Sequence, residues 1–201
     1  MTLAEAVDWV EQEIKPVTDI SSGEIKRRLN LQNDYLSREL RVPSRFITGA
    51  SATSAFNLPG NARPGGLMGA WLERSGERVK LRNVAKASEQ MPGWFQDKGH
   101  RFVLYDPYNV TAPVTPFGFR DTDTLRILVV IKPADLVQGA DEVWDGELPE
   151  HHDLVPRKVV VDILRMQTSD DMVRRAETHA HHAERQMRAA FAKSWFKEGM
   201  W

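Results

Sequence analysis

Apolar positions in the first forty-five residues recur at the spacing of two amphipathic helices. The first stripe consists of Leu3, Val7, Val10 and Ile14. Thr2 and Glu5 have the spacing of a capping box at its start, and Pro16 ends it. A second helix opens at residues 21–24, and its stripe consists of Ile25, Leu29, Leu36 and Leu40. Each helix is therefore predicted to bury one side and expose the other.

The polar side of the second helix is rich in arginine. It carries Arg27, Arg38, Arg41 and Arg45, about 200° around the helix from the apolar stripe. A charged helix face is most often simply hydrated. The alternative is contact with an acidic partner or with nucleic acid, and the sequence leaves both readings open.

Between residues 46 and 147 the pattern changes to extended segments separated by turns. Residues 69–73 and 79–82 flank Ser75 and Gly76, which predicts a hairpin, and residues 101–105 predict a strand. Residues 125–131 are apolar at every position but Arg126, so we expect that strand to be covered on both faces. Residues 83–90 predict a short helix, and the glycines and prolines of residues 59–69 predict a structural loop.

Helical periodicity returns after Pro149. The first stripe there consists of Leu154, Val155, Val159, Val160, Ile163 and Leu164. A long last helix, capped by residues 168–171, has an inner side formed by Met172, Ala176, Ala183, Met187, Ala190 and Phe191. Because neither helix pair can bury its stripe alone, we predict an α+β fold. Residues 1–45 and 148–201 would form a helical bundle, with residues 46–147 as an inserted β-rich domain.

Composition narrows the class of protein. The 201 residues include 27 Lys and Arg against 28 Asp and Glu, a balance that argues against a dedicated nucleic-acid binder. The absence of cysteine excludes disulfides, thiolate metal sites and cysteine nucleophiles. The acidic start lacks the basic region of a signal peptide, and residues 127–131 are too short an apolar run to span a bilayer. We therefore expect a soluble intracellular protein without membrane contact.

Signatures of catalysis and of phosphate binding are missing from the sequence, so neither an enzyme nor a cofactor is expected. His179 and His182 could share a helix face, but an exposed polar helix is the more ordinary interpretation. Asp121 and Asp123 precede the strongest strand, where Asp commonly builds turns. We accordingly expect no metal. The alternatives are a small metal-dependent hydrolase, in which these histidines and one aspartate converge, and a host DNA-binding regulator that uses the arginines.

Residues 134–153 have the most uneven charge in the chain, since they contain acids but no Lys or Arg. The acids are Asp135, Asp141, Glu142, Asp145, Glu147, Glu150 and Asp153. A hydrated loop is the ordinary interpretation. In a ring of identical subunits, however, Asp141, Glu142 and Asp145 of one subunit could meet the arginines of the second helix in the next.

The last seven residues are unusually apolar for a chain end. Trp195 continues the spacing of Met187 and Phe191 and could complete the buried face of the last helix. Phe196 is turned about 100° from Trp195, and Met200 and Trp201 follow a plausible helix stop at Gly199. These aromatic residues either pack on their own bundle or dock into a neighbouring protein.

Three segments resemble the head-to-tail connector proteins of tailed bacteriophages. Residues 24–30 (EIKRRLN), followed by Tyr35 and Leu36, resemble an early helix of those adaptors. Residues 131–136 (IKPADL) and 148–155 (LPEHHDLV) are similar to the strand end and the helix start that precede the C-terminal helix pair of that family. The resemblance covers most of the chain, although residues 49–69 match nothing in it.

The resemblance implies a virion structural protein, made in the host cytoplasm, without catalytic residues or cofactors. Adaptors of this kind form a ring, usually of twelve copies, beneath the portal, and the genome passes through its centre. The implied partners are the portal protein, a downstream neck or tail-completion protein and further copies of the chain, with phage DNA close by. Portal docking would then fall to Trp195, Phe196, Met200 and Trp201.

Overall fold

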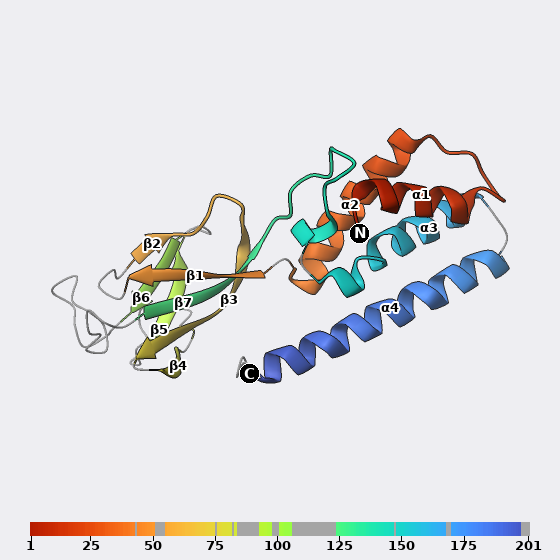
Figure 1. Cartoon of the computed structure of the whole chain (residues 1–201). Helices are drawn as coiled ribbons and strands as arrows, with labels where there is room; N and C mark the ends of the chain where they lie inside the picture. Colours follow the sequence, from red (N-terminus) through yellow and green to blue (C-terminus); the bar gives the residue numbers. More distant parts are fainter. Residues whose placement is uncertain are drawn as a thin grey trace. The chain divides into compact units, whose positions relative to one another are not determined.

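The computed structural model describes residues 1–42, 44–50, 55–74, 76–81, 83, 93–97, 101–105, 124–146, 148–167 and 170–197. The chain divides into two compact units, residues 1–43 with 133–201 (the helical unit) and residues 44–132 (the strand unit). Helices lie at both ends of the chain and antiparallel strands in its middle (Figure 1). The predicted α+β fold is therefore confirmed.

The helical unit contains α1 (Leu3–Ile14), α2 (Ser22–Leu40), α3 (Leu154–Gln167) and α4 (Asp170–Lys197). The capping box is present at the start of α1, where the Thr2 hydroxyl accepts the N–H of Glu5 and the Glu5 carboxylate accepts the N–H of Thr2. Ser21 caps α2 by accepting the N–H of Glu24. The predicted helix starts of the N-terminal pair are thus confirmed, and α3 and α4 follow as an antiparallel pair (Figure 1).

The core of the helical unit is built from the apolar stripes that the sequence predicts on α1, α2 and α3. Each of these stripes is buried along its whole length. Burying a side chain of this size stabilises a fold by about 1.5–3 kcal/mol, so the three stripes dominate the stability of the unit. The fourth helix contributes less: Ala180 and Met187 are buried, Ala176 and Ala183 are partly buried, and Ala190 is exposed. The prediction of Ala190 on the inner side was wrong.

The connection from the last strand to α3 also belongs to the helical unit. Leu136, Val143 and Trp144 are buried in the same core as the helices. A tight turn at Val143–Gly146, in which Trp144 and Asp145 have left-handed backbone angles, and a short 3₁₀ turn at Pro149–His151 lead into α3. The sequence analysis placed residues 133–147 with the strands, whereas they pack on the helices because these large apolar residues need that core.

Two asparagines of α2 hold this connection in place. The Asn30 side chain accepts the N–H of Leu136 at 2.7 Å and donates to its carbonyl oxygen at 2.9 Å. The Asn33 Oδ1 accepts the buried N–H of Trp144 at 3.3 Å. Side-chain amides therefore satisfy backbone groups that have no helix or sheet partner here.

The strand unit contains seven described strands in two sheets, with every paired strand antiparallel. One sheet has the order β1-β7-β3-β4, with β1 at Ser44–Ala50, β3 at Ala62–Arg74, β4 at Glu77–Leu81 and β7 at Thr124–Ile131. The other has the order β2-β6-β5, with β2 at Ala55–Asn57, β5 at Gly93–Asp97 and β6 at Arg101–Tyr105. The predicted hairpin and the predicted strand at residues 101–105 are both confirmed.

The last strand, β7, lies inside its sheet between β1 and β3 and is buried over residues 127–131. The prediction that both of its faces are covered is confirmed. Residues 62–69, by contrast, belong to β3 and not to a loop. The register of β3 against β7 shifts there, and a Cβ at Gly66 would lie 2.9 Å from the carbonyl oxygens of Arg63 and Val130. Position 66 therefore needs glycine because the strand is irregular there. The loop prediction was wrong for residues 62–69, whereas residues 59–61 do form a turn.

The short helix predicted at residues 83–90 lies outside the described residues, apart from Asn83. In the described part of the chain, no helix has the length and apolar character needed to cross a membrane.

Candidate functional site

The outward face of α2 carries two large apolar side chains that the core does not use. Leu31 and Tyr35 are 57% and 56% exposed and stand one helical turn apart. They share the face with Arg27 and Arg38, since the four positions follow helical spacing. The sequence analysis identified the arginines but did not weigh these two residues. Their position off the buried stripe was the available signal.

The arginines of this face are fixed by ion pairs within the helix. Glu24 binds both Arg27 and Arg28 at 2.7 Å, and Arg38 binds Asp34. The guanidinium groups of Arg27 and Arg28 lower the pKa of the Glu24 carboxyl to about 2. The Arg27 side chain is 60% exposed and that of Glu24 only 31%, so the positive group is the one presented to solvent.

The predicted arginine stripe is shorter than the sequence suggested. Arg41 is the C-cap of α2 in a left-handed conformation, with φ 58°, and not a helix residue. Arg45 lies in β1 of the strand unit, because the chain leaves the helix at Val42. Its placement on the helix was therefore wrong. Arg27 and Arg38 remain on the face of α2.

A groove of about 420 Å³ lies between α2 and the end of α3 (the α2–α3 groove). Its lining residues are Arg27, Arg28, Leu31, Gln32, Asp162, Arg165 and Met166. The Gln32 amide donates to the Asp162 carboxylate across the groove, and the Arg28 guanidinium contacts the Met166 sulfur at 3.7 Å. Met166 is itself 68% exposed, so the groove combines apolar side chains with arginines.

The predicted acidic contact residues have different roles in the fold. The Asp141 carboxylate accepts the N–H groups of Val137 and Gln138, each at 2.7 Å, and these bonds lower its pKa. Asp145 accepts the N–H of Ala134 at 3.0 Å. Two of the three acids thus shape their own loop, while the side chain of Glu142 is exposed.

The predicted portal-docking residues are only partly described. Trp195 and Phe196 belong to α4, but the positions of their side chains, and all of Met200 and Trp201, lie outside the described residues. Docking through these residues stays a prediction.

The histidines of α4 are accompanied by exposed arginines. His179 and His182 are exposed and belong to a helix face with Arg175. Asp121 and Asp123, which the hydrolase alternative requires, lie outside the described residues. Within the ranges that the structure describes, no group of three or more His, Asp or Glu side chains could hold a metal ion.

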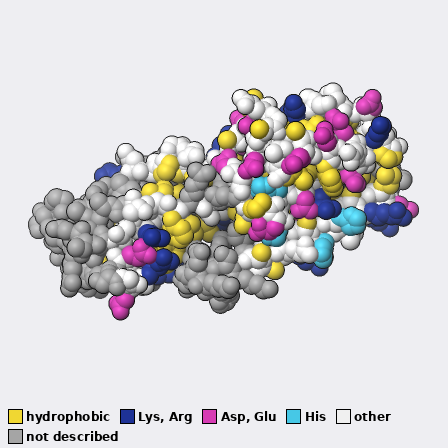
Figure 2. Space-filling model, viewed as in Figure 1, with side chains coloured by type: hydrophobic (Ala, Val, Ile, Leu, Met, Phe, Trp, Pro, Cys, Tyr) yellow, Lys and Arg dark blue, Asp and Glu magenta, His cyan; other side chains and the backbone are white. Residues whose placement is uncertain are grey.

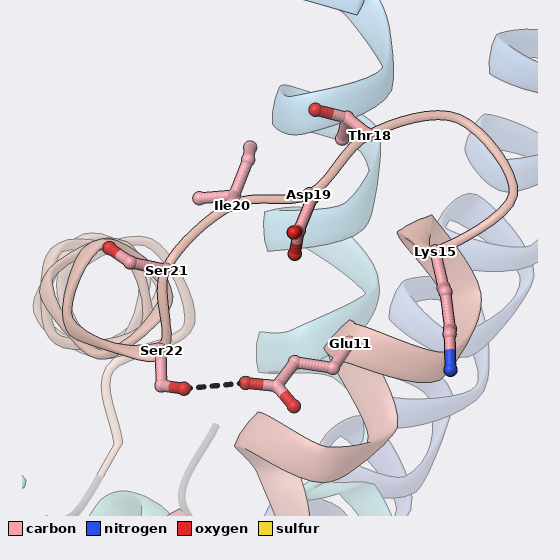
Figure 3. Close-up of a pocket in the computed structure, with 7 residues that line it drawn as sticks. All are labelled: Glu11, Lys15, Thr18, Asp19, Ile20, Ser21 and Ser22. Carbon is pink, nitrogen blue, oxygen red and sulfur yellow. Dashed lines mark hydrogen bonds between the residues drawn. The ribbon is translucent and has the colours of Figure 1, made fainter.

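A larger and more polar cavity, of about 590 Å³, lies at the turn between α1 and α2 (Figure 3). Its lining residues are Glu11, Lys15, Thr18, Asp19, Ile20, Ser21 and Ser22. The Ser22 hydroxyl donates to the Glu11 carboxylate at 2.7 Å. The lining offers mixed charges and hydroxyls without an imidazole, and the hydrogen bond between Ser22 and Glu11 links the start of α2 to α1.

Comparisons with known proteins found no family model that matches the chain and no similar curated protein.

Proposed function

We propose that the chain is a structural protein of a tailed-phage virion, a head-to-tail adaptor that forms a ring beneath the portal. The observation that carries the proposal is the outward face of α2. Exposed leucine, tyrosine and arginine side chains stand there together, and tyrosine and arginine are enriched where proteins contact one another. A face of this composition supports an assembly role.

Uneven charge supports a head-to-tail contact between copies. The strand unit carries 12 Lys and Arg against 7 Asp and Glu, whereas the helical unit carries 15 against 21. When the two surfaces that meet differ in charge, identical copies associate head to tail. Such heterologous contacts close into a ring when the rotation between neighbouring copies allows it. We expect the isolated chain to be a poorly associating monomer, whose copies touch only transiently, and the ring to form on a portal template.

The test is assembly on a candidate portal protein, followed by electron microscopy. Wild-type chain should add a ring to the portal, and the double variant Leu31→Gln with Tyr35→Gln should add none while keeping its melting temperature. The matched control is Ala189→Gln, which places the same side chain at an exposed position of α4. Normal rings from the double variant would show that the α2 face is not the interface. The absence of any ring with the wild-type chain would overturn the proposal.

A further inference from the structure

We infer that the acidic loop of one copy, residues 135–142, docks into the α2–α3 groove of the next copy. This inference rests on the proposed function, because it names the partner of the α2 face in the ring.

Exposed large apolar side chains occur in two places on the described part of the helical unit. Three of them, Leu31, Tyr35 and Met166, lie on α2 and at the end of α3. The fourth is Val137, which is 71% exposed in the acidic loop. Since both places are exposed in the same chain, Val137 does not cover the groove of its own copy. The Val137 of a second copy can cover this groove.

The acidic loop is held in one shape before it binds. The Asp141 carboxylate binds the N–H groups of Val137 and Gln138, as described above. The backbone of the loop also accepts the first N–H groups of α1: Leu3 donates to Asp141 at 2.7 Å and Ala4 to Gly139 at 3.0 Å. A loop fixed in this way loses little conformational entropy on docking, which favours binding.

Charge selects the groove as the receiving surface. The groove presents Arg27, whose side chain is twice as exposed as its acidic partner, and Arg165, 57% exposed against 30% for its partner Glu177. The loop presents Glu142 and has no Lys or Arg to oppose it. The outer face of α4 also carries exposed arginines, but among its described side chains, those of residues 171–190, no large apolar one is exposed to receive Val137.

The chain has no cysteine, so single cysteines can report the contact without background. One copy carries Val137→Cys and the other, made with a longer tag, carries Met166→Cys. Mixed under mild oxidation, they should give about tenfold more mixed disulfide dimer than a pair made with Thr178→Cys, an exposed position of α4. The excess should shrink as salt is raised, because the charged rim is screened.

Equal yields from the Met166→Cys and Thr178→Cys pairs, or a larger yield from the latter, would overturn the inference. The wild-type ring on a portal separates the two proposals. If the ring forms but the specific cross-link does not, only the loop–groove contact is contradicted. If the specific cross-link forms but the protein adds no ring to any portal, the adaptor function is contradicted and the contact is retained.

Discussion

Two asparagine side chains of α2 help to hold the backbone where the chain returns from the strands to the helices. Asn33 is buried, and its amide oxygen satisfies the N–H of a residue 111 positions later in the sequence. Trp144 and Leu148 have left-handed φ values of 50° and 55°, which non-glycine residues seldom adopt. The hydrogen bonds of Asn30 and Asn33 are among the contacts that hold the backbone in this shape.

Replacing Asn33 by alanine should destabilise the protein. The buried N–H of Trp144 loses its acceptor, and an unsatisfied buried donor costs about 1–3 kcal/mol. Urea unfolding of Asn33→Ala measures the change. Lys26→Ala, at an exposed position of the same helix, is the control and should stay within about 0.5 kcal/mol of wild type. Equal stability of the two variants would show that this hydrogen bond matters little.

The acidic loop should loosen in acid. Its two N–H donors lower the pKa of Asp141 below the ordinary 3.8, so the folded loop favours the charged carboxylate. That stabilisation is complete above the ordinary pKa and is lost as the pH falls through the lowered value. The amide signals of Val137 and Gln138 should therefore titrate with the carboxyl, at a pH below 3.8. Signals that titrate at or above the ordinary value, or also titrate in Asp141→Asn, would contradict this assignment.

At the scale of helices and strands, the sequence predicts the regularly patterned elements well. The stripes of α1, α2 and α3 were predictable because burial follows helical spacing, and β7 because nearly all of its residues are apolar. Residues 62–69 were not, since the glycines and prolines of an irregular strand resemble those of a loop. Leu31 and Tyr35 were missed because two apolar residues on a charged helix face form too short a stripe to stand out in the sequence.

Few of the described side chains of the long helix α4 are buried, and that of Met187 is the largest of them. It is fully buried, while its neighbours Gln186 and Arg188 are exposed. Met187→Ala should lower the free energy of unfolding by about 2–5 kcal/mol, because it removes buried surface and leaves a cavity. Chemical denaturation of Met187→Ala beside Gln186→Ala measures this. A loss of less than 1 kcal/mol would mean that α4 contributes little to the folded core.

At the scale of the whole molecule, the chain combines an acidic helical unit with a basic strand unit. On the face shown in Figure 2, acidic side chains are spread over the helical unit with apolar side chains exposed between them. Neither unit needs this distribution for its own core, which is apolar. In the proposed ring this distribution would have a use, because complementary charge steers identical subunits into one register.

The C-terminal residues provide the last test of assembly. Trp195 and Phe196 lie in the last turn of α4, which ends at Lys197, and Met200 and Trp201 follow it in the sequence. Burying a tryptophan is worth about 2–3 kcal/mol, so an aromatic chain end is a strong anchor for either its own bundle or a partner. If the partner is the portal, a chain that lacks residues 197–201 should melt as wild type does and fail to attach. Thermal melting and co-sedimentation with a candidate portal measure the two properties. A large fall in melting temperature with attachment retained would instead assign these residues to the bundle.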